Sequence, residues 1–188
     1  MIGCGKPSAA GLAAMQVFPF CSALGIGVGA NAGSVLGPAK ATVAHVIPRL
    51  SGLLEVSVEA DPHDIFCSQI VQTSPVGGPS GQHPYANAVV LARKTSGVAT
   101  VDSALQVLDQ LQAMEAEFGR DRSREERWGP RPLDLDLLFW GELRLDHPRL
   151  LLPHPRLHLR TFVLAPLLEA MQRAAGPDHI STQPLGSP

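Results

Sequence analysis

Hydrophobic and polar positions along this chain follow two different periods, which predicts a protein that mixes strands with helices. Apolar and small residues run together over 24–31, 66–72 and 85–93, and each run is bounded by turn or loop residues. Short runs of this kind are typical of strands. Residues 73–81, between the second and third runs, are rich in Gly and Pro and are predicted to form a loop.

Three other segments carry the helical period. Residues 38–51 predict a first helix, which Pro48 is expected to shorten or kink. Apolar residues recur every three or four positions over 101–118 and predict the clearest helix of the chain. A last helix is predicted to begin at Pro155 and to run to about Met171.

One further strand, which alternates leucine with aspartate after a Gly-Pro turn, is the most informative stretch. Successive side chains of a strand point to opposite faces, so Asp134 and Asp136 share one face and Leu133, Leu135 and Leu137 share the other. Two carboxylates this close repel each other, which favours a raised pKa or a bound cation. Paired hard oxygen ligands suit magnesium, which usually takes one or two carboxylates plus substrate phosphates.

Arg131, just upstream of this strand, carries a planar guanidinium that fits phosphate oxygens, so the stretch indicates phosphoryl-transfer chemistry. Two other interpretations of Asp134 and Asp136 stay open. They could be the solvated face of an edge strand whose leucines face the core. An Asp-x-Asp after an apolar strand also marks aspartyl-phosphate hydrolases, but Gly-Pro-Arg-Pro precedes Asp134 here, which disfavours that class.

The order of these elements predicts an α+β fold, in which an antiparallel sheet has its helices packed on one face. The 188 residues suffice for a single core. Residues 1–22 lack the charged start and sustained apolar stretch of a signal peptide, and we expect them to be a disordered extension. The folded domain is then expected to cover 23–172, followed by a disordered tail over 173–188.

Composition and charge narrow the class of partner. A hydrophobic fraction of 45% and a charged fraction of 17% are globular values. The formal net charge of −2 argues against nucleic acid or a membrane surface as partner, and no apolar run reaches the roughly 20 residues of a membrane helix. Most arginines lie between 120 and 160, which suits a polyphosphate ligand or a salt-bridged surface. Three cysteines without metal-ligand spacing fit a reducing cytoplasm.

Two longer strings of residues strengthen the phosphoryl-transfer interpretation. The string that ends at Asp136 reads R-W-G-P-R-P-L-D-L-D and closely resembles the signature of the 6-hydroxymethyl-7,8-dihydropterin pyrophosphokinases, enzymes of the folate pathway. The string that ends at Arg160 reads R-L-L-L-P-H-P-R-L-H-L-R and resembles the second signature of the same family. The resemblance covers about residues 23–172.

The resemblance implies a ferredoxin-like form of the α+β fold and a defined reaction. The pyrophosphoryl group of ATP would pass to 6-hydroxymethyl-7,8-dihydropterin, with release of AMP. Asp134 and Asp136 would hold two Mg²⁺ ions, and Arg120 and Arg131 would act on the phosphates in the catalytic step. We expect a cytoplasmic monomer whose partners are these two small molecules, with no nucleic acid and no membrane.

Positions that match the family also assign two sets of binding residues. A flat heterocycle such as a pterin needs an apolar slot and a few polar groups that fix its orientation. The positions implied for ATP are Gln112, Glu115, Arg120, Arg122, Trp128, Arg131, Leu137, Arg149, Leu151, His154 and Arg160. The positions implied for the pterin are Thr73, Ser74, Val76, Tyr85, Asn87, Trp128 and Phe162.

Each set has a plain structural alternative. Gln112 and Glu115 lie on one face of their helix, so a solvated helix face would explain them almost as well. Ordinary strand packing would explain Tyr85 and Asn87. Two functional rivals also remain: a different nucleotide-dependent kinase, which would release ADP, and a nucleotide-binding module without catalysis, which would lack an aspartate or arginine of the signatures.

Overall fold

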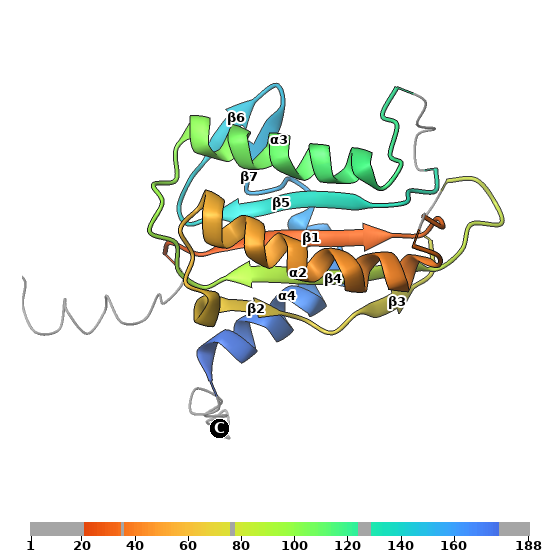
Figure 1. Ribbon diagram of the computed structural model, residues 1–188, viewed down its shortest axis with the longest axis horizontal. Helices are drawn as coiled ribbons and strands as arrows, with labels where there is room; N and C mark the ends of the chain where they lie inside the picture. The colour runs from red at the N-terminus through yellow and green to blue at the C-terminus, as the bar shows by residue number, and fades with distance from the viewer. Residues whose placement is uncertain (1–20, 35, 76–77, 124–128, 177–188) are drawn as a thin grey trace, which may run out of the picture.

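The computed structural model describes residues 21–34, 36–75, 78–123 and 129–176 as a five-stranded antiparallel sheet with helices packed against it, and a separate pair of short strands (Figure 1). Strand β1 (Leu24–Ala30) lies at the centre, between β4 (Tyr85–Ala92) and β5 (Asp134–Trp140). Both pairs are antiparallel. The other elements, in chain order, are α2 (Ala39–Ser57), a 3₁₀ turn (Pro62–Asp64), β2 (Ile65–Cys67), β3 (Val71–Thr73), α3 (Val101–Glu117), β6 (Leu145–His147), β7 (Leu150–Leu152), a 3₁₀ turn (Leu157–Leu159) and α4 (Thr161–Ala175).

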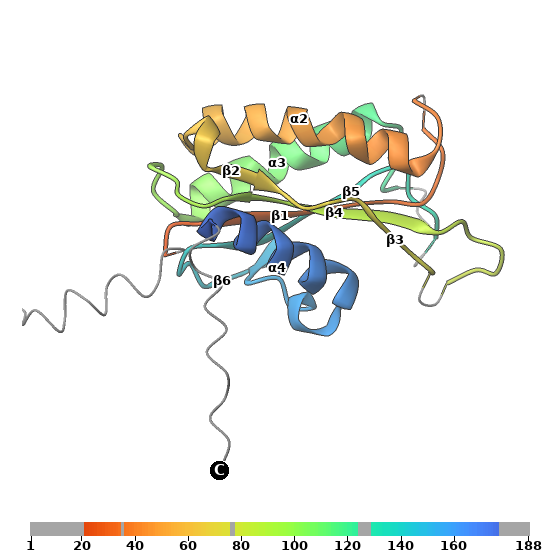
Figure 2. The same ribbon diagram turned by 90° about the horizontal axis from the view of Figure 1, so that it is seen from below.

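The α+β class and the antiparallel sheet are confirmed, but one detail of the prediction needs correction. Helices α2 and α3 cover one face of the sheet, whereas α4 lies on the opposite face (Figure 2). The strands carry apolar side chains on that second face too, and they would meet water without a cover. Val163 and Leu167 of α4 pack there against Val89, Leu91 and Leu138. Both faces of the sheet are therefore partly buried.

Helix α2 continues to Ser57, so the prediction that it ends near residue 51 is wrong. Pro48 lies inside the helix on its solvent-exposed side, where water can satisfy the carbonyl group that loses its partner. Leu50 and Leu54, which follow Pro48, are fully buried against the sheet. Tertiary packing thus outweighs the local cost of the proline.

The single strand predicted over 66–72 is two strands, β2 and β3, both paired with β4. Ser68 interrupts the ladder because its hydroxyl oxygen accepts a hydrogen bond from the Val89 amide at 3.0 Å, while its own amide donates to the Val89 carbonyl. Next to it, the Gln69 amide donates to the Glu169 carboxylate of α4 at 3.0 Å. Side chains therefore replace backbone partners at this interruption.

The last helix begins at Thr161 and not at Pro155, so that prediction is also wrong. The His154 amide donates to the Leu138 carbonyl of β5 at 2.7 Å, which holds this segment against the sheet. A 3₁₀ turn follows, and Arg160, with an extended backbone, precedes the first residue of α4. The helix then continues to Ala175, beyond the domain boundary expected at 172.

The β1–β5 pairing contains a bulge that affects where the side chains of β5 point. Ile26 pairs with Leu137 whereas Gly25 pairs with Phe139, so Leu138 is an extra residue in β5. Residues before the bulge keep strict alternation. After it, Trp140 returns to the core on the α2 and α3 face.

The predicted termini, 1–22 and 173–188, fall mostly outside the described residues; of the parts inside, Ser22 is bonded to the domain and 173–175 belong to α4. The Ser22 carbonyl accepts a hydrogen bond from the Thr95 hydroxyl at 2.9 Å, and Ala23 is fully buried. Among the described helices, none has the length and apolar character to cross a bilayer.

Candidate active site

The two aspartates of β5 occupy the sheet face that α2 and α3 leave uncovered. Leu133, Leu135 and Leu137 are buried in the core on the α2 and α3 face, as strand alternation predicted. Asp134 and Asp136 alternate with them and keep 21% and 32% of their side-chain surface exposed. The predicted geometry of this strand is therefore confirmed. The simple alternative of a solvated edge fails, because both carboxylates are paired with cations.

Asp134 is held between two arginines. One carboxylate oxygen accepts from Arg120 Nη1 at 2.6 Å, and the other accepts from Arg131 Nη1 at 2.8 Å. Burial alone would raise the pKa of Asp134, but Arg131 and Arg120 outweigh it and hold that pKa below its usual value. Asp134 is thus an anion at neutral pH.

Asp136 has weaker partners and the opposite shift. Its Oδ2 accepts from Arg160 Nη1 at 3.2 Å and lies 3.9 Å from His154 Nε2. Burial raises the pKa of Asp136, and the negative charge of Asp134 raises it further. Burial also lowers the pKa of His154, which favours its neutral form at neutral pH. Of the two carboxylates, Asp136 is therefore the one whose negative charge is less fully compensated by neighbouring cations.

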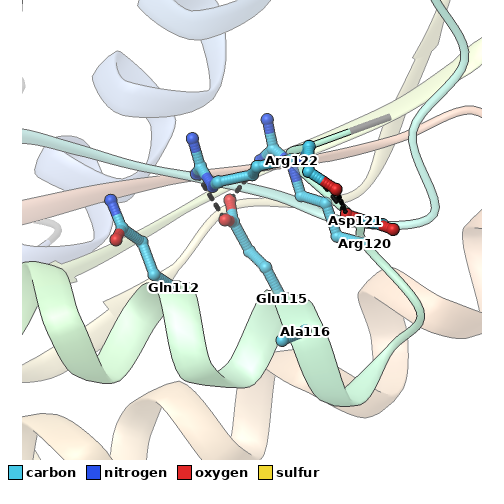
Figure 3. Close-up of a pocket in the computed structure, with 7 residues that line it drawn as sticks. Gln112, Glu115, Ala116, Arg120, Asp121 and Arg122 are labelled. Carbon is cyan, nitrogen blue, oxygen red and sulfur yellow. Dashed lines mark hydrogen bonds and ion pairs between the residues drawn. The ribbon is translucent and has the colours of Figure 1, made fainter. Parts of the chain in front are cut away.

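Glu115 of α3 lies at the centre of a third cluster, shown in Figure 3. Its side chain is 1% exposed, which excludes the solvated helix face. It forms ion pairs with Arg120 and Arg122 and accepts from the Leu135 amide of β5 at 2.7 Å. Burial raises the pKa of Glu115, although these donors oppose the rise. A cavity of about 340 Å³ opens beside it, lined by Gln112, Glu115, Ala116, Arg120, Asp121, Arg122 and Ser123.

Most of the described residues assigned to the pterin lie on the same sheet face as the aspartates. The Asn87 amide donates to the Thr73 hydroxyl at 2.8 Å, and Thr73 pairs with Tyr85 across β3 and β4. A Cβ atom placed on Gly29 of β1 would lie 3.3 Å from Asn87 Oδ1 and 3.9 Å from Asp134 Cβ. Asn87 and Asp134 are thus separated only by a glycine, which brings the two predicted binding regions together.

The remaining predicted residues surround this region less closely. Phe162 lies at the start of α4 with the Arg160 guanidinium 5.7 Å from its ring centroid. Arg149 pairs with Asp109 of α3, one turn before Gln112. The Leu137 side chain is buried, whereas Leu151 and Ser74 are exposed. Val76 and Trp128 lie outside the described residues.

Two residues near the site were not assigned from the sequence. Gly29 separates Asn87 from Asp134, and the buried Asn31 hydrogen-bonds to the Arg131 backbone. The available signal was their position, since a glycine in the central strand and a polar residue at its end are both typical of close approach at a site.

The donor set fits magnesium better than a metal held by protein ligands alone. Within the described ranges, no group of three or more His, Cys, Asp or Glu side chains lies close enough to form such a site. Asp134 and Asp136 offer hard oxygen atoms on one face, and Mg²⁺ commonly takes its remaining ligands from water and substrate phosphates. The surrounding arginines carry the planar guanidinium groups that suit phosphate oxygens.

Paired carboxylates suited to a hard cation, with arginines suited to phosphate beside them, are the arrangement expected of a nucleotide-dependent phosphoryl- or pyrophosphoryl-transfer enzyme. Comparison with known proteins gives the particular family. The family described as 7,8-dihydro-6-hydroxymethylpterin-pyrophosphokinase matches residues 25–172. The chain belongs to this family, which confirms the resemblance given by its two signature strings.

Curated relatives carry the name 2-amino-4-hydroxy-6-hydroxymethyldihydropteridine pyrophosphokinase. The protein from Synechocystis is 36% identical over 79% of this chain and 66% of its own length. The one from Haemophilus influenzae is 39% identical over 63% of this chain and 69% of its own length. The one from Pseudomonas aeruginosa is 47% identical over 46% of this chain and 54% of its own length. The matched segments thus span between about half and two thirds of these relatives.

Proposed function

We propose that this protein transfers the pyrophosphoryl group of ATP to the hydroxyl oxygen of 6-hydroxymethyl-7,8-dihydropterin and releases AMP. The observation that carries the proposal is the family match over 25–172, in a chain where Asp134 pairs with Arg120 and Arg131 while Asp136 pairs with Arg160. Two substrates bound on one sheet face would place the pterin hydroxymethyl group beside the β-phosphate. Positioning of this kind supplies much of the acceleration in phosphoryl transfer.

Asp134 and Asp136 are proposed as the ligands of two magnesium ions. When bound, such ions neutralise charge on the phosphates and make an attacking hydroxyl group easier to deprotonate. The raised pKa of Asp136 supports this role, because a carboxylate with too little compensating charge gains most from a cation. Asp134 has its charge already balanced by Arg120 and Arg131, so it orients those arginines as well.

Arg120 and Arg131 are proposed to stabilise negative charge on the transferring group. Each guanidinium has five N–H donors, so it can hold Asp134 and a phosphate oxygen at the same time. Donors that are held in place before the reaction lose little energy to reorganisation as charge develops. Catalysis thus depends on Asp134 as a fixed support for both cations.

The other residues on the ATP side are proposed to hold the nucleotide at a distance from the reacting atoms. The cavity beside Glu115 is bounded by α3 and suits the nucleoside or its phosphates. Leu137 has a buried side chain, so any contact it makes must come from its backbone at the edge of β5. The residues proposed for this role are Gln112, Glu115, Arg122, Trp128, Leu137, Arg149, Leu151, His154 and Arg160.

The pterin is proposed to lie between Asn87 and Phe162. An amide side chain offers both a donor and an acceptor to the edge of a heterocycle, and the bond to Thr73 fixes its orientation. The Phe162 ring, with Arg160 beside it, provides a flat surface for stacking. Ser74, Val76, Tyr85 and Trp128 complete the proposed set.

Analysis of the nucleotide product tests the proposed reaction. The purified protein would be incubated with magnesium, ATP and the reduced pterin, and the nucleotides would then be separated. We expect AMP in equal amount to the pterin pyrophosphate. ADP as the main product would identify a kinase of another kind, and unchanged ATP would leave only a binding module.

The number of metal ions, the oligomeric state and the compartment are further parts of the proposal. Titration of metal against the complex with a nonhydrolysable ATP analogue should give two magnesium ions per chain. Sedimentation should give a monomer, as expected for a site built from one chain. Fractionation should find the protein in the cytoplasm, where its substrates would be made.

A further inference from the structure

We propose that Asn31 is a positioning residue, which holds Arg131 in place and ties it to the loop that leads into the pterin side of the site. This inference rests on the proposed function, because it assigns Arg131 to the phosphates. Asn31 is the first residue after β1 and is 1% exposed. The loops after β1, before β4 and before β5 all lie at the same end of the sheet (Figure 1).

Asn31 fixes the Arg131 backbone from both sides. Its side-chain Oδ1 accepts a hydrogen bond from the Arg131 backbone amide at 2.8 Å. The backbone amide of Asn31 donates to the Arg131 carbonyl at 3.0 Å. The Ala32 amide donates to the same carbonyl at 3.0 Å. The backbone of Arg131 is therefore fixed, and from it the side chain extends so that the guanidinium contacts the Asp134 carboxylate at 2.8 Å.

The other half of the Asn31 amide binds a different loop. Its Nδ2 donates to Gln82 Oε1 at 2.8 Å, and Gln82 Nε2 in turn donates to the Pro79 carbonyl at 3.3 Å. Gln82 precedes Tyr85 and Asn87 in the chain, so this bond reaches the segment that begins the pterin side. A cavity of about 410 Å³ lies between the three loops. A single side chain thus joins residues 31, 82 and 131 across the end of the sheet.

The residue type matters because an amide carries an acceptor and a donor on one rigid plane. Aspartate would keep the acceptor for Arg131 and lose the donor for Gln82, while alanine would lose both. A residue that only stabilises the fold would change the unfolding temperature but act independently of Arg131. A residue that acts through Arg131 would lose its effect once the guanidinium is removed, and the two roles are therefore distinguishable.

The test is a double-mutant cycle of Asn31→Ala and Arg131→Ala, measured for turnover with both substrates. We expect Asn31→Ala to lower kcat at least tenfold. We also expect the double variant to turn over within about threefold of Arg131→Ala alone. Independent effects that multiply in the double variant would overturn the proposal. The same cycle, run on ATP affinity by calorimetry, gives a readout that needs no turnover.

Variants of Gln82 test the link between Asn31 and the pterin side of the site. Gln82→Ala should reduce the extent to which a bound ATP analogue strengthens pterin binding, and Gln82→Glu, which keeps the acceptor for Asn31, should restore it. Ser80→Ala, an exposed position in the same loop, is the matched control and should behave like wild type. Equal behaviour of Gln82→Ala and wild type would overturn this link.

The wild-type protein in these assays reports separately on the proposed reaction. If the wild type produces AMP but the effects of Asn31→Ala and Arg131→Ala multiply in the double variant, the role of Asn31 is overturned and the proposed function stands. A wild-type protein that neither binds ATP nor turns over would overturn both.

Discussion

Only Leu135 separates Asp134 from Asp136, yet their surroundings shift the pKa values of the two aspartates in opposite directions. Arg131 and Arg120 hold the pKa of Asp134 down against burial, whereas burial and the charge of Asp134 raise the pKa of Asp136. A lowered pKa in the folded state means that the fold stabilises the anion, and a raised pKa means the reverse. The two aspartates should therefore respond differently to the same substitution.

Asp136→Asn should make the metal-free protein slightly more stable, because it removes a poorly compensated charge. Asp134→Asn should make it less stable, because Arg120 and Arg131 lose their shared partner. Each variant should lose turnover by a factor of roughly a hundred or more, since loss of one preorganised electrostatic contact costs ~2.7–4 kcal/mol. Melting temperatures without metal and kcat with magnesium measure both effects. Active variants with unchanged magnesium dependence would show that neither aspartate is a metal ligand.

Arg131→Ala should slow the chemical step more than it weakens ATP binding. Arg131 contacts the Asp134 carboxylate and lies where charge would develop, so its contribution should be greatest in the transition state. We expect kcat to fall by about 100-fold, the lower end of the range for such contacts. Arg131→Lys, which keeps the charge and loses the planar guanidinium, should recover only part of the loss. A raised KM with unchanged kcat would instead make Arg131 a uniform-binding residue.

At the scale of elements, the outer edge of β5 is closed by side chains of α3 and the loop that follows it. Glu115 accepts from the Leu135 amide, and Arg120 reaches the Leu133 carbonyl at 3.4 Å. An ion pair here takes the hydrogen-bonding places that a neighbouring strand would fill. The edge is thereby protected from pairing with another chain while its backbone stays close to the cavity.

Glu115→Gln should change how stability depends on pH. The folded state raises the Glu115 pKa above its ordinary value of 4.5, so the folded form binds the proton more tightly than the unfolded form. The contribution of this group is therefore largest below the ordinary pKa and is lost as pH rises through the raised value. Relative to Glu115→Gln, the wild-type free energy of unfolding should fall across that window. Urea unfolding at a series of pH values measures the difference, and parallel curves would contradict the assigned shift.

The elements that the sequence predicted well are those whose pattern is local. The leucines and aspartates of β5 and the apolar period of α3 each depend on the strand or helix alone. The extent of α2 was missed because burial of Leu50 and Leu54 outweighs Pro48. The break between β2 and β3 was missed because it depends on Ser68 meeting Val89, far away in the chain.

The same division holds for the site. The cations and carboxylates next to one another in the signature strings were predictable, since the family resemblance fixes them. The contacts of Gly29 and Asn31 could not be predicted, because their partners come from other segments. Gly29 lies next to Asn87 and Asp134, and Asn31 bonds to Gln82 and Arg131. Such contacts exist only after the sheet has formed.

At the scale of the whole molecule, the contribution of Ser22 and Ala23 to stability can be tested by truncation. A chain that begins at residue 21 should keep its activity and melting temperature, because the Ser22 and Ala23 contacts remain. A chain that begins at residue 24 should melt lower, since it loses the bond to Thr95 and the Ala23 carbonyl that accepts from Gly141. Equal melting temperatures of the two truncated chains would show that these contacts contribute nothing.

The bulge at Leu138 divides β5 into two parts that differ in which alternate residues face the α2 and α3 side. Before the bulge, Leu133, Leu135 and Leu137 face the core while Asp134 and Asp136 face the proposed site. After it, Trp140 faces the core and its indole nitrogen donates to the Thr95 hydroxyl at 3.1 Å. An insertion or deletion of one residue at Leu138 would leave the facing of the side chains unchanged in both parts. The same change at Leu135 would turn one of the two aspartates toward the core and bring a leucine to the proposed site. The strand therefore has one place where its length can vary without altering the chemistry.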